Sequence, residues 1–177
     1  MRKVTNEELH RPTIEQFAEM EKIPVVVVLD NIRSAQNIGA FFRTSDAFAT
    51  ESIALCGITA TPPSRDIHKS ALGAEMTVKW SYHSTTVECV EELRAKGYTI
   101  LAIEQIENAV MLQNMCFERG KKYALIFGNE VMGVDQEVVN ICDGAIEIPQ
   151  SGTKHSINVS VAGGVVLWSA YQQLAKL

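Results

Sequence analysis

The chain has 177 residues, of which 46% are hydrophobic and 21% are charged, and its formal net charge at pH 7 is −5. This length fits one domain of ordinary size, which can bury a substantial core without disulfides or a metal. No window approaches the roughly 18 uninterrupted apolar residues that a membrane span requires. The negative charge disfavours a protein that coats nucleic acid by bulk electrostatics, although it leaves room for a local basic patch.

The N-terminus has no apolar core followed by a small-residue cleavage site, so nothing in it indicates secretion. The cysteines are scattered and form no Cys-x-x-Cys pair, which favours reduced structural thiols over a disulfide frame or a zinc site. They are Cys56, Cys89, Cys116 and Cys142. We therefore expect a soluble, cytoplasmic protein with neither a metal site nor a membrane segment.

Apolar periodicity and cap signals predict strands and helices that alternate along the chain. The expected elements are a capped helix at 13–20, a buried strand at 25–29, a helix at 37–48 with Asn37 as its N-cap, a strand at 52–55, a loop at 59–69 leading into a small-residue helix at 71–74, a strand at 78–80, a helix at 86–96 ended by Gly97, strands at 98–103 and 123–127, a helix at 135–142, a strand at 145–148 and a last helix from Ser156. This order predicts an α/β fold, a mostly parallel sheet flanked by helices. The predicted fold forms a single domain at 25–177, which follows a short helical extension at 1–24.

Polar segments follow apolar ones at 128–130, 148–150 and 156–158. Because ligands of open α/β sheets lie outside the carboxyl ends of the strands, these segments predict one shared pocket. Several functions fit such a pocket. Cations in or near the polar loops are candidates for holding phosphate, with ordinary solvated charges as the alternative. They are Arg33, Arg43, Arg65, His68, Lys69, Lys154 and His155.

Three motifs stand in order along the chain: Asn37-Ile-Gly-Ala-Phe-Phe-Arg43-Thr-Ser-Asp-Ala, Gly128-Asn-Glu130-Val-Met-Gly133-Val and Ile148-Pro-Gln-x5-Ser156-Ile-Asn158-Val-Ser-Val-Ala-Gly. Together they resemble the motifs of the SpoU (TrmH-like) RNA ribose methyltransferases, in the SPOUT superfamily. Three motifs in the right order are far more specific than a lone glycine-rich loop. The resemblance spans roughly residues 25 to 171.

The resemblance implies transfer of a methyl group from S-adenosylmethionine to a ribose 2′-hydroxyl of RNA, in a homodimer whose fold ends in a deep trefoil knot. General topology rules would exclude that knot. Five glycines would supply the close backbone approaches that a threaded segment needs, namely Gly128, Gly133, Gly152, Gly163 and Gly164. The first motif, with Leu29-Asp30-Asn31 ahead of it, favours tRNA over rRNA as the substrate, whereas the compact size and acidic charge resemble members with other targets.

The resemblance also assigns a catalytic set, which comprises Asn37, Arg43, Glu130, Ser156 and Asn158. Arg43 matches the catalytic arginine of the family. We expect it to bind a phosphate or stabilise the alkoxide, since an ordinary guanidinium stays protonated and is a poor base. The alternatives are a surface ion pair for Arg43, helix capping for Asn37 and Ser156, and a backbone hydrogen bond for Glu130.

The cofactor is expected to lie against three strand ends and the start of the last helix, at Ala102, Ile103, Glu104, Ile126, Phe127, Gly128, Ile148, Gln150, Ser156, Ile157 and Asn158. Two other functions remain open. A relative that has lost catalysis would act as an RNA-binding or assembly factor. A different nucleotide-dependent α/β enzyme is the second, although the chain lacks a Gly-x-Gly-x-x-Gly after its first strand and a P-loop lysine.

Overall fold

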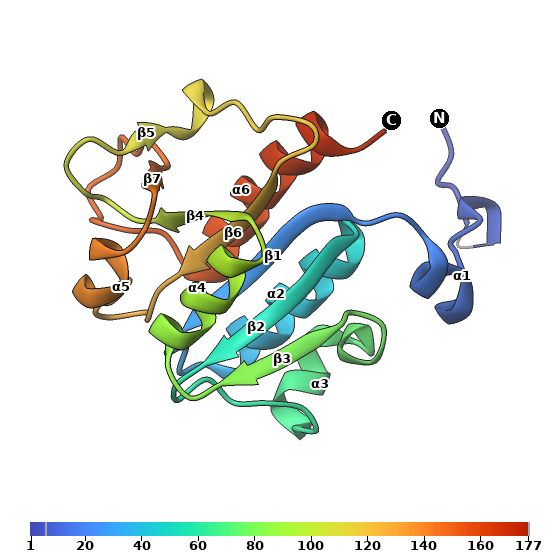
Figure 1. The fold of residues 1–177 in the computed structure, drawn as a ribbon. Helices are drawn as coiled ribbons and strands as arrows, with labels where there is room; N and C mark the ends of the chain where they lie inside the picture. Colours follow the sequence, from blue (N-terminus) through green and yellow to red (C-terminus); the bar gives the residue numbers. More distant parts are fainter. Residues whose placement is uncertain (6, 177) are drawn as a thin grey trace.

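The structure, a computed structural model, describes residues 1–5 and 7–176. Its centre is a seven-stranded sheet in the order β3-β2-β1-β6-β4-β7-β5, and every neighbouring pair of strands is parallel. Helices lie on both sides of the sheet (Figure 1). The predicted mostly parallel sheet flanked by helices is therefore confirmed, while the trefoil knot stays a prediction.

The strands are β1 (Ile23–Asp30), β2 (Thr50–Cys56), β3 (Trp80–His83), β4 (Tyr98–Ile103), β5 (Val110–Met111), β6 (Lys122–Phe127) and β7 (Gly144–Glu147). The α-helices are α1 (Ile14–Glu19), α2 (Ala35–Ala47), α3 (Arg65–Ala71), α4 (Thr86–Ala95), α5 (Gln136–Asn140) and α6 (Val159–Leu174). Single 3-10 turns are η1 (Glu7–Leu9), η2 (Ala74–Met76) and η3 (Leu112–Asn114). Every predicted strand is present, although the one expected at 78–80 begins at Trp80.

Side chains along β1 alternate between two hydrophobic layers. Val25, Val27 and Leu29 pack into the layer that contains residues of α2 and α6, whereas Val26 and Val28 pack into the layer of α4 and α5. Each of the five is at most 3% exposed. Because helices cover both faces of the sheet, this strand is apolar throughout rather than alternately polar. The layering also puts α2 and α6 on one face.

Helix α2 begins before the predicted position. Ser34 is its N-cap, and the Ser34 Oγ accepts a hydrogen bond from the backbone N–H of Asn37 at 3.3 Å. The prediction that Asn37 caps this helix is therefore wrong. Asn37 lies one turn inside the helix, where its side chain can make contacts other than the cap.

Helix α6 begins after the predicted position. Asn158 is its N-cap, because its Oδ1 accepts hydrogen bonds from the backbone N–H groups of Ser160 at 2.9 Å and Val161 at 3.3 Å. The predicted start at Ser156 is wrong, and so is the capping role considered for Ser156. The backbone before Asn158 is an exposed loop rather than a first helical turn.

The segment between β2 and β3 also differs from the prediction. A loop was expected at 59–69, yet α3 already begins at Arg65 because Ser64 caps it, accepting from the Ile67 backbone N–H at 3.5 Å. The α-helix expected at 71–74 is replaced by a left-handed turn at Leu72, with φ 54°, followed by η2. The strict alternation of strand and helix also fails between β4 and β6, where only β5 and η3 lie.

Three of the five glycines singled out in the sequence are tightly packed, namely Gly128, Gly133 and Gly163. A Cβ at Gly128 would lie 2.1 Å from the carbonyl carbon of Gly133, far inside normal contact. For Gly152 and Gly164 the prediction is wrong, since a Cβ there would meet no atom of the described chain within 4 Å. The first lies in an exposed loop and the second on an open side of α6.

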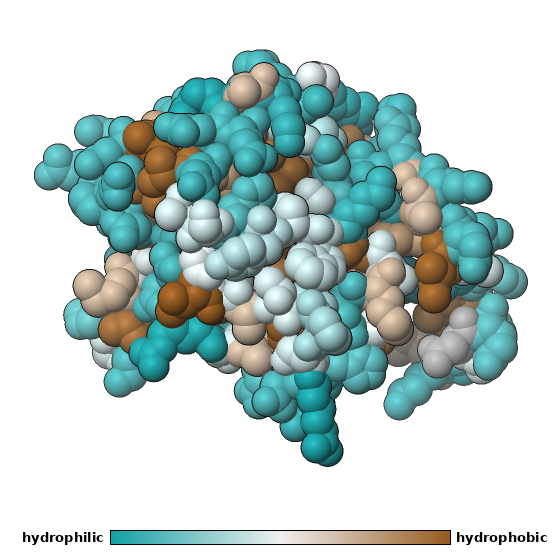
Figure 2. Space-filling model, turned by 60° about the horizontal axis from the view of Figure 1, so that its bottom comes forward, coloured by the Kyte–Doolittle hydropathy of each residue, from teal (hydrophilic) through white to brown (hydrophobic). Residues whose placement is uncertain are grey.

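The surface seen in Figure 2 is mostly hydrophilic, with apolar residues in separate patches. Within the described ranges, no helix combines the length and the apolarity that crossing a membrane demands. All four cysteines are free thiols, and Cys56 and Cys89 are buried. Among the residues described, no group of three or more His, Cys, Asp or Glu side chains is arranged to hold a metal ion.

Candidate functional site

A cavity of about 530 Å³ opens at the carboxyl ends of β4, β6 and β7, beside the start of α6. Its wall draws on residues 103–105, 127–133, 146–148 and 155–159, with Gln150 and Ala162 at its margin. The polar segments at 128–130, 148–150 and 156–158 all contribute to it, as expected for the carboxyl edge of a parallel sheet. Segments far apart in the sequence therefore meet at one cavity.

Most residues expected to bind the cofactor line this cavity: Ile103, Glu104, Phe127, Gly128, Ile148, Gln150, Ser156, Ile157 and Asn158. Ala102 and Ile126 do not. Both are fully buried in the layer beneath α4, on the other face of the sheet from Phe127. The period of two along a strand explains the difference, because neighbouring side chains point to opposite faces.

The loop after β6, residues 128–134, lines the cavity through 128–133 and is called the cavity loop below. From this loop the Glu130 carboxylate binds the start of α2. It accepts hydrogen bonds from the backbone N–H groups of Arg33 and Ser34, both at 3.0 Å, and from Asn37 Nδ2 at 2.9 Å. An anionic side chain is favourable there, because unpaired N–H groups and the helix dipole make this end of a helix positive. Glu130 thus joins the second motif to the first.

The pKa of the Glu130 carboxyl lies below its ordinary value of 4.5. Partial burial acts to raise the pKa, and the hydrogen bonds from Arg33, Asn37 and Ser34 outweigh that effect. The carboxylate is therefore ionised near neutral pH, and both oxygens already accept hydrogen bonds. These contacts suit a positioning residue rather than a general base.

Asn37 connects Glu130 to the start of α6. Its Oδ1 accepts from Asn158 Nδ2 at 3.1 Å and from Ser160 Oγ at 3.4 Å. Asn37 is only 8% exposed, so its amide is held by partners rather than by solvent. A continuous polar network, Glu130–Asn37–Asn158, therefore contains one residue from each of the three motifs. Glu130 and Asn158 line the cavity, whereas Asn37 does not and joins the two.

The cavity loop after β6 is held by contacts that sequence reasoning did not find. Glu104 accepts from the backbone N–H of Val134 at 3.0 Å through Oε2 and from that of Gln105 at 2.8 Å through Oε1. Gln105 in turn donates from Nε2 to the carbonyl of His155 at 3.1 Å. Residues at the end of β4 are thus hydrogen-bonded both to the cavity loop and to the loop before α6. No local sequence pattern predicts contacts between segments so far apart in the chain.

Two further members of the expected catalytic set are placed differently. Ser156 lines the cavity but is exposed, and its side chain has no hydrogen bond within the part of the chain that is described. Arg43 does not line this cavity. It lines a second groove of about 690 Å³, to which Arg11, Phe17, Met76 and other side chains contribute.

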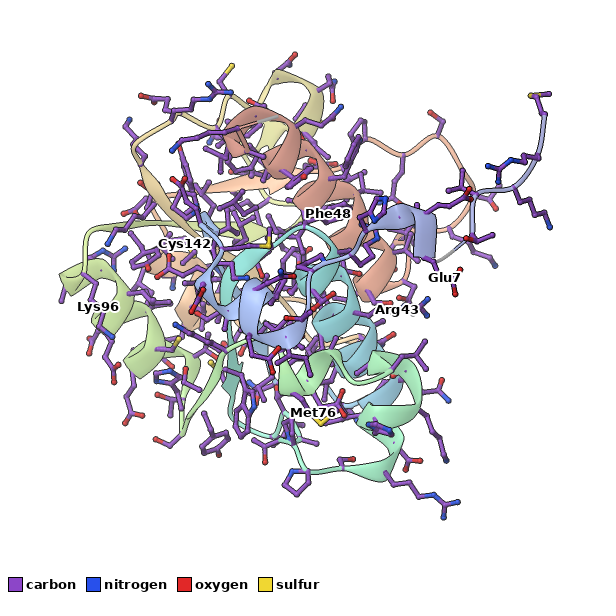
Figure 3. All side chains as sticks on the ribbon, turned by 90° about the vertical axis from the view of Figure 1, so that its right-hand side faces the viewer. Glu7, Arg43, Phe48, Met76, Lys96 and Cys142 are labelled. Atoms are coloured by element: carbon purple, nitrogen blue, oxygen red, sulfur yellow. The ribbon has the colours of Figure 1, made fainter. Side chains whose placement is uncertain are left out.

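Helix geometry accounts for the position of Arg43. Six residues separate it from Asn37 on α2, which corresponds to a rise of about 9 Å and a rotation of about 240°. Figure 3 shows Arg43 on the same side of the molecule as Met76. Its guanidinium makes no hydrogen bond or ion pair to any other residue in the described ranges, so the alternative of a surface ion pair finds no partner there.

The other cations that are candidates for holding phosphate fall into separate groups. Arg65, His68 and Lys69 lie on α3, where His68 Nδ1 is 2.5 Å from the Glu75 carboxylate and Lys69 Nζ is 2.8 Å from Asp66. Arg33 is exposed beside the start of α2, and Lys154 and His155 are exposed in the loop before α6. Of the seven expected cations, His155 alone lines the cavity. The seven cations therefore do not share the cavity as a single site.

The fold and the site define a class: a parallel α/β protein with a ligand cavity at the carboxyl edge, built from three motifs that meet in one polar network. A model of the SpoU rRNA Methylase family matches residues 24–168. A tRNA (guanosine(18)-2′-O)-methyltransferase of Thermus thermophilus is 30% identical over 169 residues, which cover 96% of this chain and 85% of that protein. The chain belongs to the SpoU methylase family.

Solved structures agree with this assignment. An AdoMet-bound rRNA methyltransferase from Sinorhizobium meliloti has a TM-score of 0.81 at 25% identity, over 90% of this chain and 61% of that one. The TrmH/SpoU tRNA modifying enzyme of A. aeolicus has a TM-score of 0.80 at 27% identity, over 90% of this chain and 80% of that one.

Proposed function

We propose that this chain, through a methyltransferase domain at 25–177 with a short extension at 1–24, transfers the methyl group of S-adenosylmethionine to a ribose 2′-hydroxyl of RNA in the cytoplasm. The observation that carries the proposal is the Glu130–Asn37–Asn158 network, whose two ends line the cavity. The Thermus relative has the name of a tRNA methyltransferase, and the A. aeolicus structure has that of a tRNA modifying enzyme. Together with the first motif they favour tRNA over rRNA.

The cavity fits the cofactor in size and chemistry. Its volume of about 530 Å³ is in the range of small-molecule sites, about 300–1,000 Å³. Ile103, Phe127, Ile146 and Ile148 offer apolar contacts for the adenine. Gly128 has no Cβ, which lets the backbone of Gly133 and Val134 pack directly against it and fixes the loop that lines the cavity. When bound, the cofactor supplies a methyl group on a sulfonium, which is a good leaving group.

The residues of the chain then have mainly to position the ribose oxygen and assist the loss of its proton. Asn37 is well suited to position groups near the reacting atoms, because Glu130 and Asn158 fix the orientation of its amide. Glu130 serves as its anionic support. Arg43 binds a phosphate next to the target ribose or stabilises the alkoxide, as the charge and geometry of a guanidinium allow.

A second protomer would supply Arg43 to this cavity, because within its own chain Arg43 lines a different groove. Helix α6 offers a surface for that protomer. Val161, Val165 and Trp168 lie on one helical face and are 55%, 41% and 46% exposed. The stripe begins next to residues 157–159, which line the cavity, so a second copy packed on it would lie beside the cavity. Helix α2 packs against α6 within each chain, and the α2 of the second copy would therefore lie close to this shared surface. The active unit is therefore a homodimer.

Complementation tests the shared site. Arg43→Ala and Asn37→Ala variants are each expected to lack methyl transfer, the first with its cofactor affinity nearly intact. Mixed dimers, purified through two different tags, should recover about half of the wild-type activity per dimer, because one composite site has both residues. Mixed dimers as inactive as the parents, or a wild-type chain that sediments as a monomer at assay concentration, would refute the composite site.

The activity itself is tested with labelled S-adenosylmethionine and total RNA from a strain that lacks this gene, followed by mapping of 2′-O-methylated nucleosides in size-separated fractions. Label at one position of a tRNA is the expected result. Label confined to rRNA would correct the substrate. Calorimetric binding of S-adenosylmethionine without label in any fraction would favour the alternative, a catalytically inactive RNA-binding or assembly factor.

A further inference from the structure

The tip of the cavity loop is unusually apolar for its exposure. Val131 and Met132 are 73% and 82% exposed, and both line the cavity. They directly follow Glu130, whose carboxylate turns away to bind the start of α2. Two large apolar side chains in water beside a polar site indicate a surface that is covered when the protein works.

The tip is held firmly, so its exposure is not that of a loose loop. Asn129 Oδ1 accepts from the backbone N–H groups of Val131 at 2.9 Å and Met132 at 3.2 Å. The Gly133 N–H donates to the Asn129 carbonyl at 2.9 Å, which closes the turn. The Asn129 side chain is itself anchored, since Nδ2 donates to the carbonyl of Asn31 at 2.8 Å. The two side chains are thus presented at a fixed place.

The proposed reaction suggests what covers them. The base and the reacting 2′-oxygen are attached to neighbouring carbons of the ribose, so the base must rest against a wall next to the reacting groups. Glu130, which supports Asn37, is the residue immediately before the tip. A flat base presents an apolar face of the kind that thioether and aliphatic side chains contact well.

We propose that Val131 and Met132 form a platform on which the base of the target nucleotide packs once it is unstacked from its RNA. This inference rests on the proposed function and assigns its base contact. Neither side chain has a hydrogen-bond donor, and the platform therefore recognises a base face rather than the edge that distinguishes one base from another. Discrimination between bases must come from other groups at the cavity margin, such as Gln105 or Gln150.

Methyl-labelled methionine provides a direct test. The chain has six methionines, so a ¹³C-methyl-methionine sample gives five internal controls for Met132, whose signal is assigned with Met132→Leu. With S-adenosylhomocysteine present, addition of the RNA that accepts methyl in the activity assay should shift the Met132 methyl signal upfield by the ring current of the base. A shift with S-adenosylhomocysteine alone would mean that the tip covers the cofactor. No shift on RNA binding would also overturn the proposal.

Kinetics provide the second test. Met132→Ser should raise the KM for RNA about tenfold, the effect of losing one stacked base, while the affinity for S-adenosylhomocysteine stays the same. Met132→Leu keeps an apolar surface and should largely preserve the KM. Val110→Ala, at another exposed apolar position outside the cavity, is the matched control. An unchanged KM in Met132→Ser, or a loss of dimer instead, would overturn the platform, whereas a wild-type protein without methyl transfer would refute the proposed function itself.

Discussion

Asn37 and Glu130 are 93 residues apart in the chain and are joined by a hydrogen bond of 2.9 Å between Asn37 Nδ2 and the carboxylate. An asparagine suits this position because it donates to Glu130 while its Oδ1 accepts from Asn158. Neither aspartate nor a hydroxyl residue matches both partners with this geometry. The three motifs are therefore coupled through one amide group.

Asn37→Asp is expected to abolish most methyl transfer and to destabilise the fold by about 1–3 kcal/mol, the usual effect of an unsatisfied partner. The new carboxylate cannot donate to Glu130, and it places a second negative charge beside the first. Denaturant unfolding and labelled methyl transfer measure the two effects. Asn140→Asp, at an exposed position of α5, is the control and should match wild type in both.

The hydrogen bonds to Glu130 predict a specific dependence of stability on pH. Because its pKa in the folded state lies below 4.5, the ionised carboxylate stabilises the fold fully above about pH 5, and this contribution is lost as the pH falls through the lowered pKa. Glu130→Gln should therefore be less stable than wild type by a constant amount between about pH 5.5 and 7.5, with a smaller difference in acid.

Urea unfolding at several pH values measures this difference. Glu107→Gln, an exposed carboxylate without a hydrogen bond among the described residues, controls for the loss of one negative charge and should show no such pattern. A gap between wild type and Glu130→Gln that widens toward acid would contradict the assigned interactions.

Capping by Ser34 links helix stability to the site. Ser34→Ala should cost about 1 kcal/mol of stability and also lower methyl transfer, because the first turn of α2 carries Asn37. Thr85→Ala removes the equivalent cap of α4, where Thr85 Oγ1 accepts from the Glu88 N–H at 3.2 Å. Its loss of stability should be similar, with activity unchanged, since α4 lies on the other face of the sheet. Equal losses of activity in both variants would attribute the effect to stability alone.

Local signals in the sequence were sufficient where local interactions decide the structure. The capping box Thr13-x-x-Gln16 starts α1 as predicted, and β4 matches its predicted bounds, since an apolar run and Gly97 delimit it. Strand β5 has only two residues and depends on pairing with β7, which no local pattern reveals. Asn37 was misassigned as a cap although Ser34, three residues earlier, carried an equally good signal.

The location of the cavity was predictable from the predicted topology, because a parallel sheet brings the polar carboxyl ends of β4, β6 and β7 together. What could not be predicted is which residues touch. The bonds that Glu130 and Glu104 make depend on loop conformation and join segments far apart in the sequence. The separation of Arg43 from the cavity follows from helical rotation, and in the proposed homodimer the second protomer would supply this residue.

Substitution of Gly128 tests how closely the backbone of the cavity loop packs at this residue. In Gly128→Ala the new Cβ would lie 2.1 Å from both the Gly133 carbonyl carbon and the Val134 nitrogen, so the loop backbone must move. We expect a loss of stability of about 1–3 kcal/mol, the usual cost of overpacking. The affinity for S-adenosylmethionine should fall at least about tenfold, equivalent to about 1.4 kcal/mol, because the same loop lines the cavity.

Gly152→Ala is the matched control, since Gly152 lies in a neighbouring loop where an added Cβ meets no described atom within 4 Å. Calorimetric titration with S-adenosylmethionine and thermal unfolding of both variants separate binding from folding. Gly152→Ala should bind like wild type. If Gly128→Ala also kept full affinity, the cofactor would have to lie away from the loop after β6, and the cavity at the carboxyl ends of the strands would lose its assigned ligand.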